Sequence, residues 1–236
     1  MELIDIADTL CRDLEGLTFS PPVTHVYNPF VYAREPQRIY LERYGRGGAE
    51  TLLLGMNPGP WGMAQTGVPF GAVPEVRDWL GIEAPVQRPA QEHPKRPVTG
   101  FQCPRHEVSG RRLWGWARDR FGTPKGFFER FFVHNYCPLM FLEASGRNLT
   151  PDKLKAAERR ALLEPCDVAL RRSVEALGVI RVVGVGAWSE SRARVALEGI
   201  DVEIRRVLHP SPASPAANKG WAAAAERQFR EMGIDV

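Results

Sequence analysis

The chain has 236 residues, of which 44% are hydrophobic, and this is enough for one domain with a sizeable core. No stretch approaches the roughly 20 apolar residues of a membrane span, and the acidic segment 1–17 lacks the basic and apolar regions of a signal peptide. The net charge of +3 identifies no class of partner by itself. We therefore expect a single domain over residues 1–236, no membrane partner, and a cytoplasmic location (cytosol or nucleoid in a bacterium, nucleus in a eukaryote).

Short apolar runs alternate with amphipathic segments along the chain, which is the pattern of an α/β protein. Helices are predicted over residues 2–17, 33–44, 74–80 (a short one), 110–121, 150–177, 186–197 and 221–232. Strands are predicted over residues 51–54, 131–136, 179–185 and 202–208, with polar residues in the last that favour an edge. This alternation predicts a three-layer α/β/α sandwich around a four-stranded parallel sheet.

Proline and glycine refine these boundaries. Thr150 followed by Pro151 predicts a helix start, and Pro165 predicts an interruption of the helix that follows. Residues 19–32 are expected to form a loop. Residues 83–104 contain five prolines and are expected to form a long surface excursion within the same domain.

The loop over residues 55–71 holds five glycines and three prolines, which exclude a helix or a ladder-forming strand. It follows the first predicted strand, and ligands of open α/β sheets bind at the carboxyl ends of strands. Its few polar side chains are Asn57, Gln65 and Thr66, and Phe70 offers a flat apolar face. This composition predicts a pocket for a planar molecule with polar edges.

Basic residues concentrate between positions 85 and 130, where ten Lys and Arg stand against four Asp and Glu. Such a surface can face phosphates, but charge alone favours a solvated, partly helical face. The four cysteines are far apart and form no Cys-x-x-Cys pair, which favours free thiols over a zinc site, a cluster or disulfides. No metal or cofactor is predicted.

Polar residues follow three of the predicted strands: Asn57, Asn135 and His209. Each alone is most simply structural, as a turn residue, a loop partner or a capped surface histidine. Because parallel strands end at the same edge of a sheet, the three side chains are predicted to share one cleft there.

Four segments carry a family resemblance: the loop at 55–71 (GMNPGPWGMAQTGVPFG), HNYCPL at 134–139, SGRNLTP at 145–151, and HPSP at 209–212 with ANKGW at 217–221. From about Pro29 onwards, the chain resembles the single-strand-selective monofunctional uracil-DNA glycosylases. The length of the first motif makes an accidental match improbable. The resemblance implies an α/β/α fold, a monomer that acts on single- and double-stranded DNA, and release of uracil and of 5-hydroxymethyluracil without strand cleavage.

The resemblance also implies roles for individual residues. Asn57 would position the hydrolytic water, and His209 would hydrogen-bond O2 of the base. The base would be held by Phe70, which stacks on it, by Asn135, which reads its edge, and by the backbone from Met56, while Gly59 leaves space near the sugar. The duplex would be contacted by the loop residues Ser211, Pro212, Ala213, Ser214 and Lys219.

Elementary chemistry agrees with these roles. Cleavage of the glycosidic bond builds negative charge on the departing base, which a histidine donor stabilises. An asparagine amide offers a donor and an acceptor that match O4 and N3–H of uracil but not cytosine. Asparagine is no strong base, so a slower enzyme is expected than superfamily members with Asp at that position.

One departure from the family pattern and two alternative functions remain at this stage. Family members can carry arginine where this chain has Ala213, which puts activity on duplexes in doubt. A hydrolase of free nucleosides could use the same loop, although the basic segment and the second loop argue against it. A non-catalytic module that binds damaged DNA is disfavoured because both Asn57 and His209 are present.

Overall fold

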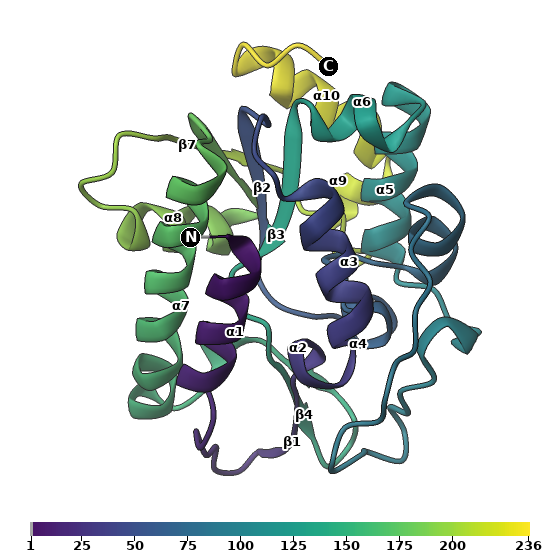
Figure 1. The fold of residues 1–236 in the computed structure, drawn as a ribbon, viewed down its shortest axis with the longest axis vertical. Coiled ribbons are helices and arrows are strands. Elements are labelled where there is room, and N and C mark those ends of the chain that lie inside the picture. Colours follow the sequence, from purple (N-terminus) through teal and green to yellow (C-terminus); the bar gives the residue numbers. More distant parts are fainter. Residues whose placement is uncertain (1) are drawn as a thin grey trace.

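A four-stranded parallel sheet runs through the middle of the molecule in the computed structural model, which describes residues 2–236 (Figure 1). Its strands are β2 Thr51–Gly55, β3 Phe131–Asn135, β6 Arg181–Val185 and β7 Glu203–Val207. They lie in the order β3, β2, β6, β7, and each neighbouring pair is parallel. The predicted sheet is confirmed, and β7 lies at an edge as its polar residues indicated.

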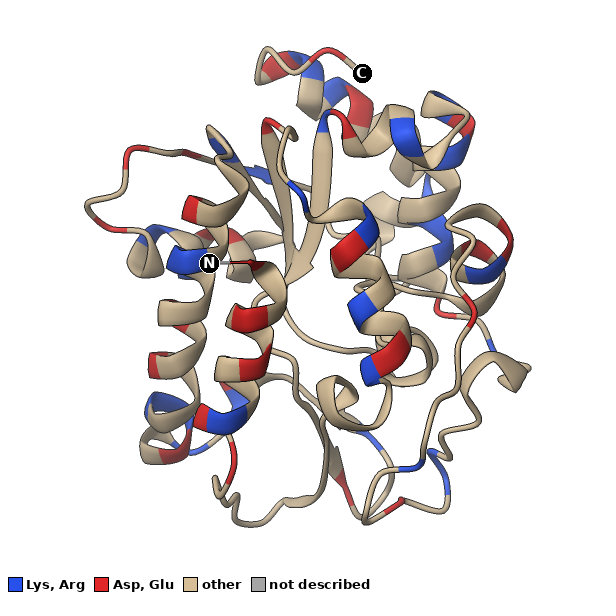
Figure 2. Ribbon diagram, viewed as in Figure 1, with Lys and Arg blue, Asp and Glu red and all other residues tan. Residues whose placement is uncertain are grey.

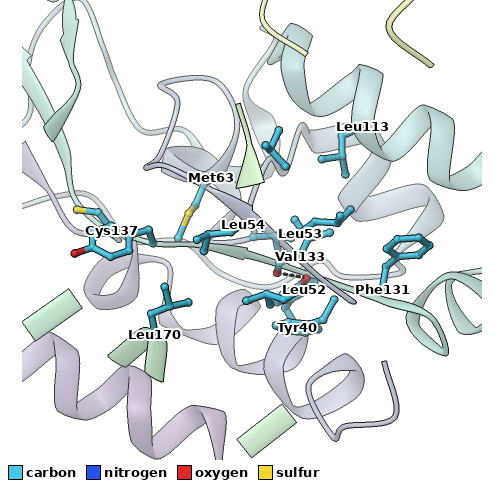
Figure 3. Close-up of a cluster of buried hydrophobic side chains, with 14 of the residues drawn as sticks. Tyr40, Leu52, Leu53, Leu54, Met63, Leu113, Phe131, Val133, Cys137 and Leu170 are labelled. Carbon is cyan, nitrogen blue, oxygen red and sulfur yellow. Dashed lines mark hydrogen bonds between the residues drawn. The ribbon is translucent and has the colours of Figure 1, made fainter. Parts of the chain in front are cut away.

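Strand β2 is buried along its whole length because it has a neighbour on each side and a helical layer on each face. Figure 3 shows its three leucines, Leu52, Leu53 and Leu54, surrounded by other apolar side chains. The buried hydroxyl of Tyr40 donates a hydrogen bond of 2.7 Å to the carbonyl of Val133, so this polar atom is paired inside the core.

Helices cover both faces of the sheet. One layer holds α1 Leu3–Asp13, α3 Arg34–Tyr44, α7 Ala156–Leu177 and α8 Ala187–Ala196, and the other holds α5 Val108–Phe121, α6 Pro124–Phe128 and α10 Trp221–Glu231. Two adjacent residues of β3 illustrate the division, since successive strand side chains point to opposite faces. Phe132 stacks on Tyr40 of α3 at 5.4 Å, whereas Phe131 packs against Trp116 of α5 at 5.9 Å. The three-layer prediction is confirmed.

A second, antiparallel sheet lies below the first in Figure 1 and was not predicted. It consists of β1 Val23–Tyr27, β4 Met140–Glu143 and β5 Asn148–Leu149, in the order β1, β4, β5. Residues 19–32 are therefore not only loop: they hold β1 and a short helix, α2 Pro29–Tyr32. Both elements are too short for hydrophobic periodicity to identify.

Three local predictions of secondary structure are wrong. Thr150 and Pro151 begin a single 3-10 turn, Pro151–Lys153, and α7 starts only at Ala156. Helix α7 continues through Pro165, because its buried side chains and its packing against α1 compensate for the missing amide hydrogen. The glycine-rich loop contains one helical turn, α4 Met63–Thr66, which Gly67 ends with a φ of 71°.

The remaining elements are short. They are a π-helical turn at Glu75–Trp79, a 3-10 turn at Gly100–Gln102 and a helical turn, α9 Pro215–Asn218. The excursion over residues 83–104 is otherwise irregular, as predicted. Among the residues that the structure describes, no helix combines the length and apolar character needed to cross a bilayer. Nor do the described residues gather three or more potential metal ligands.

His134 of β3 lies beneath α1, α3 and α7, and its burial lowers its pKa from 6.5 to about 4. The unfolded chain therefore binds a proton before the folded one as pH falls. The contribution of His134 to the free energy of unfolding is therefore fully present above pH 6.5 and is expected to be lost toward pH 4, by an amount on the order of 3 kcal/mol. Urea unfolding at pH 7.5 and 4.5 checks this: His134→Gln is expected to weaken the pH dependence, and equal pH dependence in the two proteins would contradict it.

Candidate active site

A cavity of about 260 Å³ opens where the parallel strands end. Six residues that the sequence singled out for catalysis or base binding line it together: Met56, Asn57, Gly59, Phe70, Asn135 and His209. Ser211 lines it as well. Residues up to 155 positions apart in sequence meet here because the three strand ends share one edge of the sheet. Their individual roles stay predictions.

Asn57 is held in one orientation by the chain that follows β3. Its side-chain Nδ2 donates a hydrogen bond of 3.1 Å to the carbonyl of Leu139. The backbone around it is fixed as well, because the amide of Cys137 donates to the carbonyl of Met56 at 2.9 Å. With Nδ2 engaged, Oδ1 is left as an acceptor at the cavity. A water molecule that donates to this oxygen would be held at a defined position.

Asn135 lies at the bottom of the cavity and is 5% exposed. Its Nδ2 contacts the sulfur of Met63 at 3.1 Å, and its buried Oδ1 has no hydrogen-bond partner among the described residues. An unpaired buried acceptor costs free energy unless a ligand donates to it. Gly55 makes room for this arrangement, since a Cβ there would lie 2.1 Å from Oδ1 of Asn135.

Phe70 has a φ of 55°, a conformation that costs a bulky residue on the order of 1–3 kcal/mol. Its neighbours hold it there. The indole of Trp114 donates to the carbonyl of Pro69 at 3.1 Å, and the hydroxyl of Thr66 donates to the carbonyl of Gly71 at 2.8 Å. Gly110 of α5 packs so closely that a Cβ would overlap the carbonyl oxygen of Phe70. These contacts hold Phe70 in its strained conformation and so fix an aromatic face at the cavity.

His209 follows β7, and its ring lies 6.2 Å from that of Phe70. Its Nδ1 accepts a hydrogen bond of 3.0 Å from the amide of Ser211, so the neutral ring carries its proton on Nε2. Burial lowers the pKa of His209 below 6.5, which favours this neutral form at pH 7. The site therefore contains a neutral imidazole donor in a defined tautomer.

Arg112 of α5 holds the loop that begins at His209. Its guanidinium donates to the carbonyls of Pro210 and Ser211 at 3.0 and 3.3 Å, and to Oδ1 of Asn218 at 2.8 Å. Asn218 in turn donates to the carbonyl of Pro212 at 2.8 Å. Sequence reasoning treated Arg112 only as one of many basic residues. The structure shows that it joins the two ends of this loop.

The five residues predicted to contact DNA all lie in this loop, and only Ser211 reaches the cavity. Pro212, Ala213 and Lys219 are exposed. Ser214 caps α9 by accepting a hydrogen bond of 3.4 Å from the amide of Ala217. Their contact with DNA stays a prediction.

Four further polar residues line the cavity and were not predicted: Glu107, Ser109, Asn148 and Thr150. Asn148 and Thr150 belong to the segment 145–151 that resembles the glycosylase family, which was a usable signal. Glu107 is one of few acidic residues in a basic stretch, and nothing in the sequence pointed it toward the loop at 55–71. Burial raises the pKa of the Glu107 carboxyl.

Gln65 and Thr66, two of the polar side chains that the loop offered for the pocket, do not line it, and neither does Trp61 of the same loop. Gln65 is buried and ties the loop to the excursion, donating to the carbonyls of Pro60 and Pro97 at 2.9 and 3.0 Å. Thr66 holds the turn at Phe70. Trp61 instead supports two arginines, Arg96 and Arg105, whose guanidinium carbons lie 5.3 and 4.5 Å from its ring.

The basic segment at 85–130 divides into two parts. Along α5 and α6 and directly after them, a carboxylate pairs with each of Arg111, Arg118, Lys125 and Arg130, and Figure 2 shows basic and acidic residues interspersed there. In the excursion and directly after it, Arg88, Lys95 and Arg105 are exposed, and no ion pair with a described carboxylate involves them. A phosphate-facing surface is thus better supported in the excursion than on the helices.

The four cysteines are unpaired in the described chain. Cys103, Cys137 and Cys166 are buried, and Cys11 is half-buried. Burial raises the pKa values of Cys11 and Cys166, which disfavours their reactive thiolate forms. Nothing about these thiols points to the chemistry of the cavity.

Comparison with known proteins identifies close relatives in three mammals. The single-strand selective monofunctional uracil DNA glycosylase of Mus musculus is 57% identical over 227 residues, which is 95% of this chain and 81% of the relative. The protein of the same name from Rattus norvegicus is 57% identical over 227 residues, covering 95% of this chain and 82% of the relative. That from Bos taurus is 56% identical over 224 residues, covering 94% and 82%.

A crystal structure of wild-type SMUG2 from Pedobacter heparinus shares the fold, with a TM-score of 0.68 and 19% identity. The match covers 99% of this chain and 97% of that one. A scan against models of protein families finds no match. Identity above one half along nearly the whole chain nevertheless shows the relationship. The chain belongs to the family of single-strand selective monofunctional uracil-DNA glycosylases.

Proposed function

We propose that the protein flips uracil out of DNA and hydrolyses its N-glycosidic bond, leaving an abasic site. The observation that carries this proposal is the convergence of Asn57, Asn135 and His209 on one cavity, with Phe70 beside them. Uracil is planar, and its polar edge needs a donor and an acceptor side by side. Asn135 offers both, because its buried Oδ1 is unpaired and can accept from N3–H, and its Nδ2, which contacts the sulfur of Met63, has a second hydrogen to donate to O4.

Bond cleavage follows from the remaining groups. As the bond between N1 and C1′ breaks, its electron pair moves onto the base, and O2 becomes negative. The Nε2–H of His209 donates to that oxygen, and the bond gains strength because the flipped base displaces water from the cavity. Phe70 holds the ring of the base in the matching plane.

Water completes the reaction. A molecule that donates to Oδ1 of Asn57 attacks C1′ on the side opposite the departing base, and its proton passes to solvent. The uracil anion takes up a proton after release. Because Asn57 orients the water without removing its proton, the bond must be largely broken before attack. This arrangement uses no cofactor.

The proposed substrate is DNA, single- or double-stranded, with 5-hydroxymethyluracil accepted as well, and the active unit is a monomer. Extrusion of the base costs least in single strands and mismatches. The loop at 209–220 lies at the mouth of the cavity, where a wedge would act. Compared with the arginine that family members can carry at this position, Ala213 offers less apolar surface and no charge for opening a duplex. Single strands are therefore expected to react faster than duplexes.

The test is a uracil-containing oligonucleotide incubated with the protein and then treated with alkali. Cleavage at the uracil position, after alkali only, is expected. No cleavage at any salt concentration, or activity on free deoxyuridine instead, would contradict the proposal. Tight binding without base release, unaffected by His209→Ala, would indicate a binding module.

Lys219 provides the second part of this test. An amine near the abasic sugar could form a Schiff base and cut the strand. Lys219 is exposed, however, so its amine is hydrated, which does not favour its use as a nucleophile. Strand cleavage without alkali that disappears in Lys219→Ala would refute monofunctional hydrolysis.

Arg112→Ala is expected to slow uracil release about 10- to 100-fold, because a loosened loop misplaces His209 and Ser211. Arg112→Lys should recover little, since an ammonium cannot reproduce the three-way guanidinium contact. Arg118→Ala is the matched control on the same helix, where the arginine pairs only with its exposed neighbour. Equal single-turnover rates for Arg112→Ala and the parent protein would contradict this role.

A further inference from the structure

Glu107 occupies a place in the cavity that no role assigned so far explains. It immediately precedes α5 and reaches across to the loop at 55–71. A Cβ added to Gly59 would lie 2.3 Å from Oε2 of Glu107, and one added to Gly62 would lie 3.0 Å from its Cβ. The amide of Trp61 is 3.4 Å from Oε2. Two glycines therefore make space for this carboxyl beside the pocket.

The contacts of Asn135 show which edge of the base the carboxyl would face. Its Nδ2, the atom suited to O4 of uracil, lies against the sulfur of Met63. Met63 follows Gly62, which packs on Glu107. Around the pyrimidine ring, O2 is followed by N3, then O4 and then C5. With His209 at O2 and Asn135 at N3 and O4, C5 would come next to the side of the cavity that continues from Nδ2 of Asn135 through Met63 to Glu107.

We infer that the Glu107 carboxyl reads the substituent at C5 of the flipped pyrimidine, accepting a hydrogen bond from a hydroxyl group and disfavouring a methyl group. This inference rests on the proposed function, because it needs the base to be seated as described there. It makes Glu107 a specificity-determining residue for the same reaction.

The discrimination follows from the chemistry of a partly buried carboxyl. A hydroxymethyl group at C5 can donate to Oε2, so that the carboxyl stays paired when the base fills the cavity. The methyl group of thymine has nothing to donate and would cover the same oxygen. A polar group covered without a partner opposes binding, and sites built to bond a hydroxyl reject the analogue that lacks it.

The experiment compares single-turnover rates on single-stranded oligonucleotides that differ only at one base: uracil, 5-hydroxymethyluracil or thymine. Glu107→Ala is expected to lower the ratio of the 5-hydroxymethyluracil rate to the uracil rate about 10- to 100-fold. Glu107→Gln keeps an acceptor oxygen and should hold the ratio within about threefold of the parent. Glu83→Ala, which removes an exposed carboxylate of the excursion over residues 83–104, is the control.

Gly59→Ala tests the same contact without removing the carboxyl, because the new methyl would push Oε2 aside. It should lower the ratio in the same direction, and it carries the test if Glu107→Ala does not fold. An unchanged ratio in Glu107→Ala, or equal losses on both bases in the alanine and glutamine variants, would overturn the inference alone. Failure of the parent protein to release uracil would instead overturn the proposed function.

Discussion

Replacement of His209 by alanine is expected to lower the single-turnover rate of uracil release by about 10²–10³-fold, the usual cost of one missing oxyanion donor. The structure gives the reason. The amide of Ser211 occupies Nδ1, so Nε2–H is the donor available to O2 of the base. Alanine removes this donor but leaves the bond between Arg112 and the loop intact. DNA binding is therefore expected to change much less than the rate.

The pH dependence of uracil release by the parent protein provides an independent check on the role of His209. Because the pKa of His209 lies below 6.5, the neutral donor persists from alkaline pH down through pH 6.5. Activity should be flat over that range and fall only at lower pH, where a proton on Nδ1 would oppose the amide of Ser211. Loss of activity already between pH 8 and 7 would contradict a neutral His209.

The central fold followed from the sequence because its signals are strong. Runs such as Leu52 to Leu54 are buried on both faces, and buried parallel strands are almost continuously apolar. The small antiparallel sheet escaped because β5 has only two residues and β1 mixes Thr24 and His25 with apolar neighbours. Pro165 misled because local propensity predicted a break, whereas tertiary packing keeps α7 intact.

The residues of the candidate site likewise fall into two groups, those that strand topology predicts and those that only tertiary packing brings to the cavity. Asn57, Asn135 and His209 follow strands, so topology alone placed them at one edge, and the cavity brings them together. Glu107 and Arg112 come from the other helical layer, and their approach depends on packing that no local pattern encodes. The sequence reflects that packing only in Gly59, Gly62 and Gly110, because each of these glycines leaves room for a close neighbour. Such glycines can be explained once a structure is known, but they do not name the partner beforehand.

The second large effect is expected at Asn57. Asn57→Ala should slow uracil release about 10²-fold, because the water then lacks its fixed acceptor at the cavity. DNA binding should persist, since Asn57 takes no part in holding the base. The comparison uses single-turnover rates and binding of the same oligonucleotide. A rate within a few-fold of the parent would show that another group, such as Asn148, orients the water.

Asn57→Asp separates positioning from base catalysis. In the parent protein Nδ2 donates to the carbonyl of Leu139 at 3.1 Å, which turns Oδ1 toward the cavity. An ionised aspartate in that orientation would set a negative oxygen against the carbonyl oxygen, so the side chain must turn and the water loses its place. At pH 8 the variant is therefore expected to be slower than the parent, although a carboxylate is the stronger base. A faster variant would mean that proton removal, and not orientation, limits the reaction.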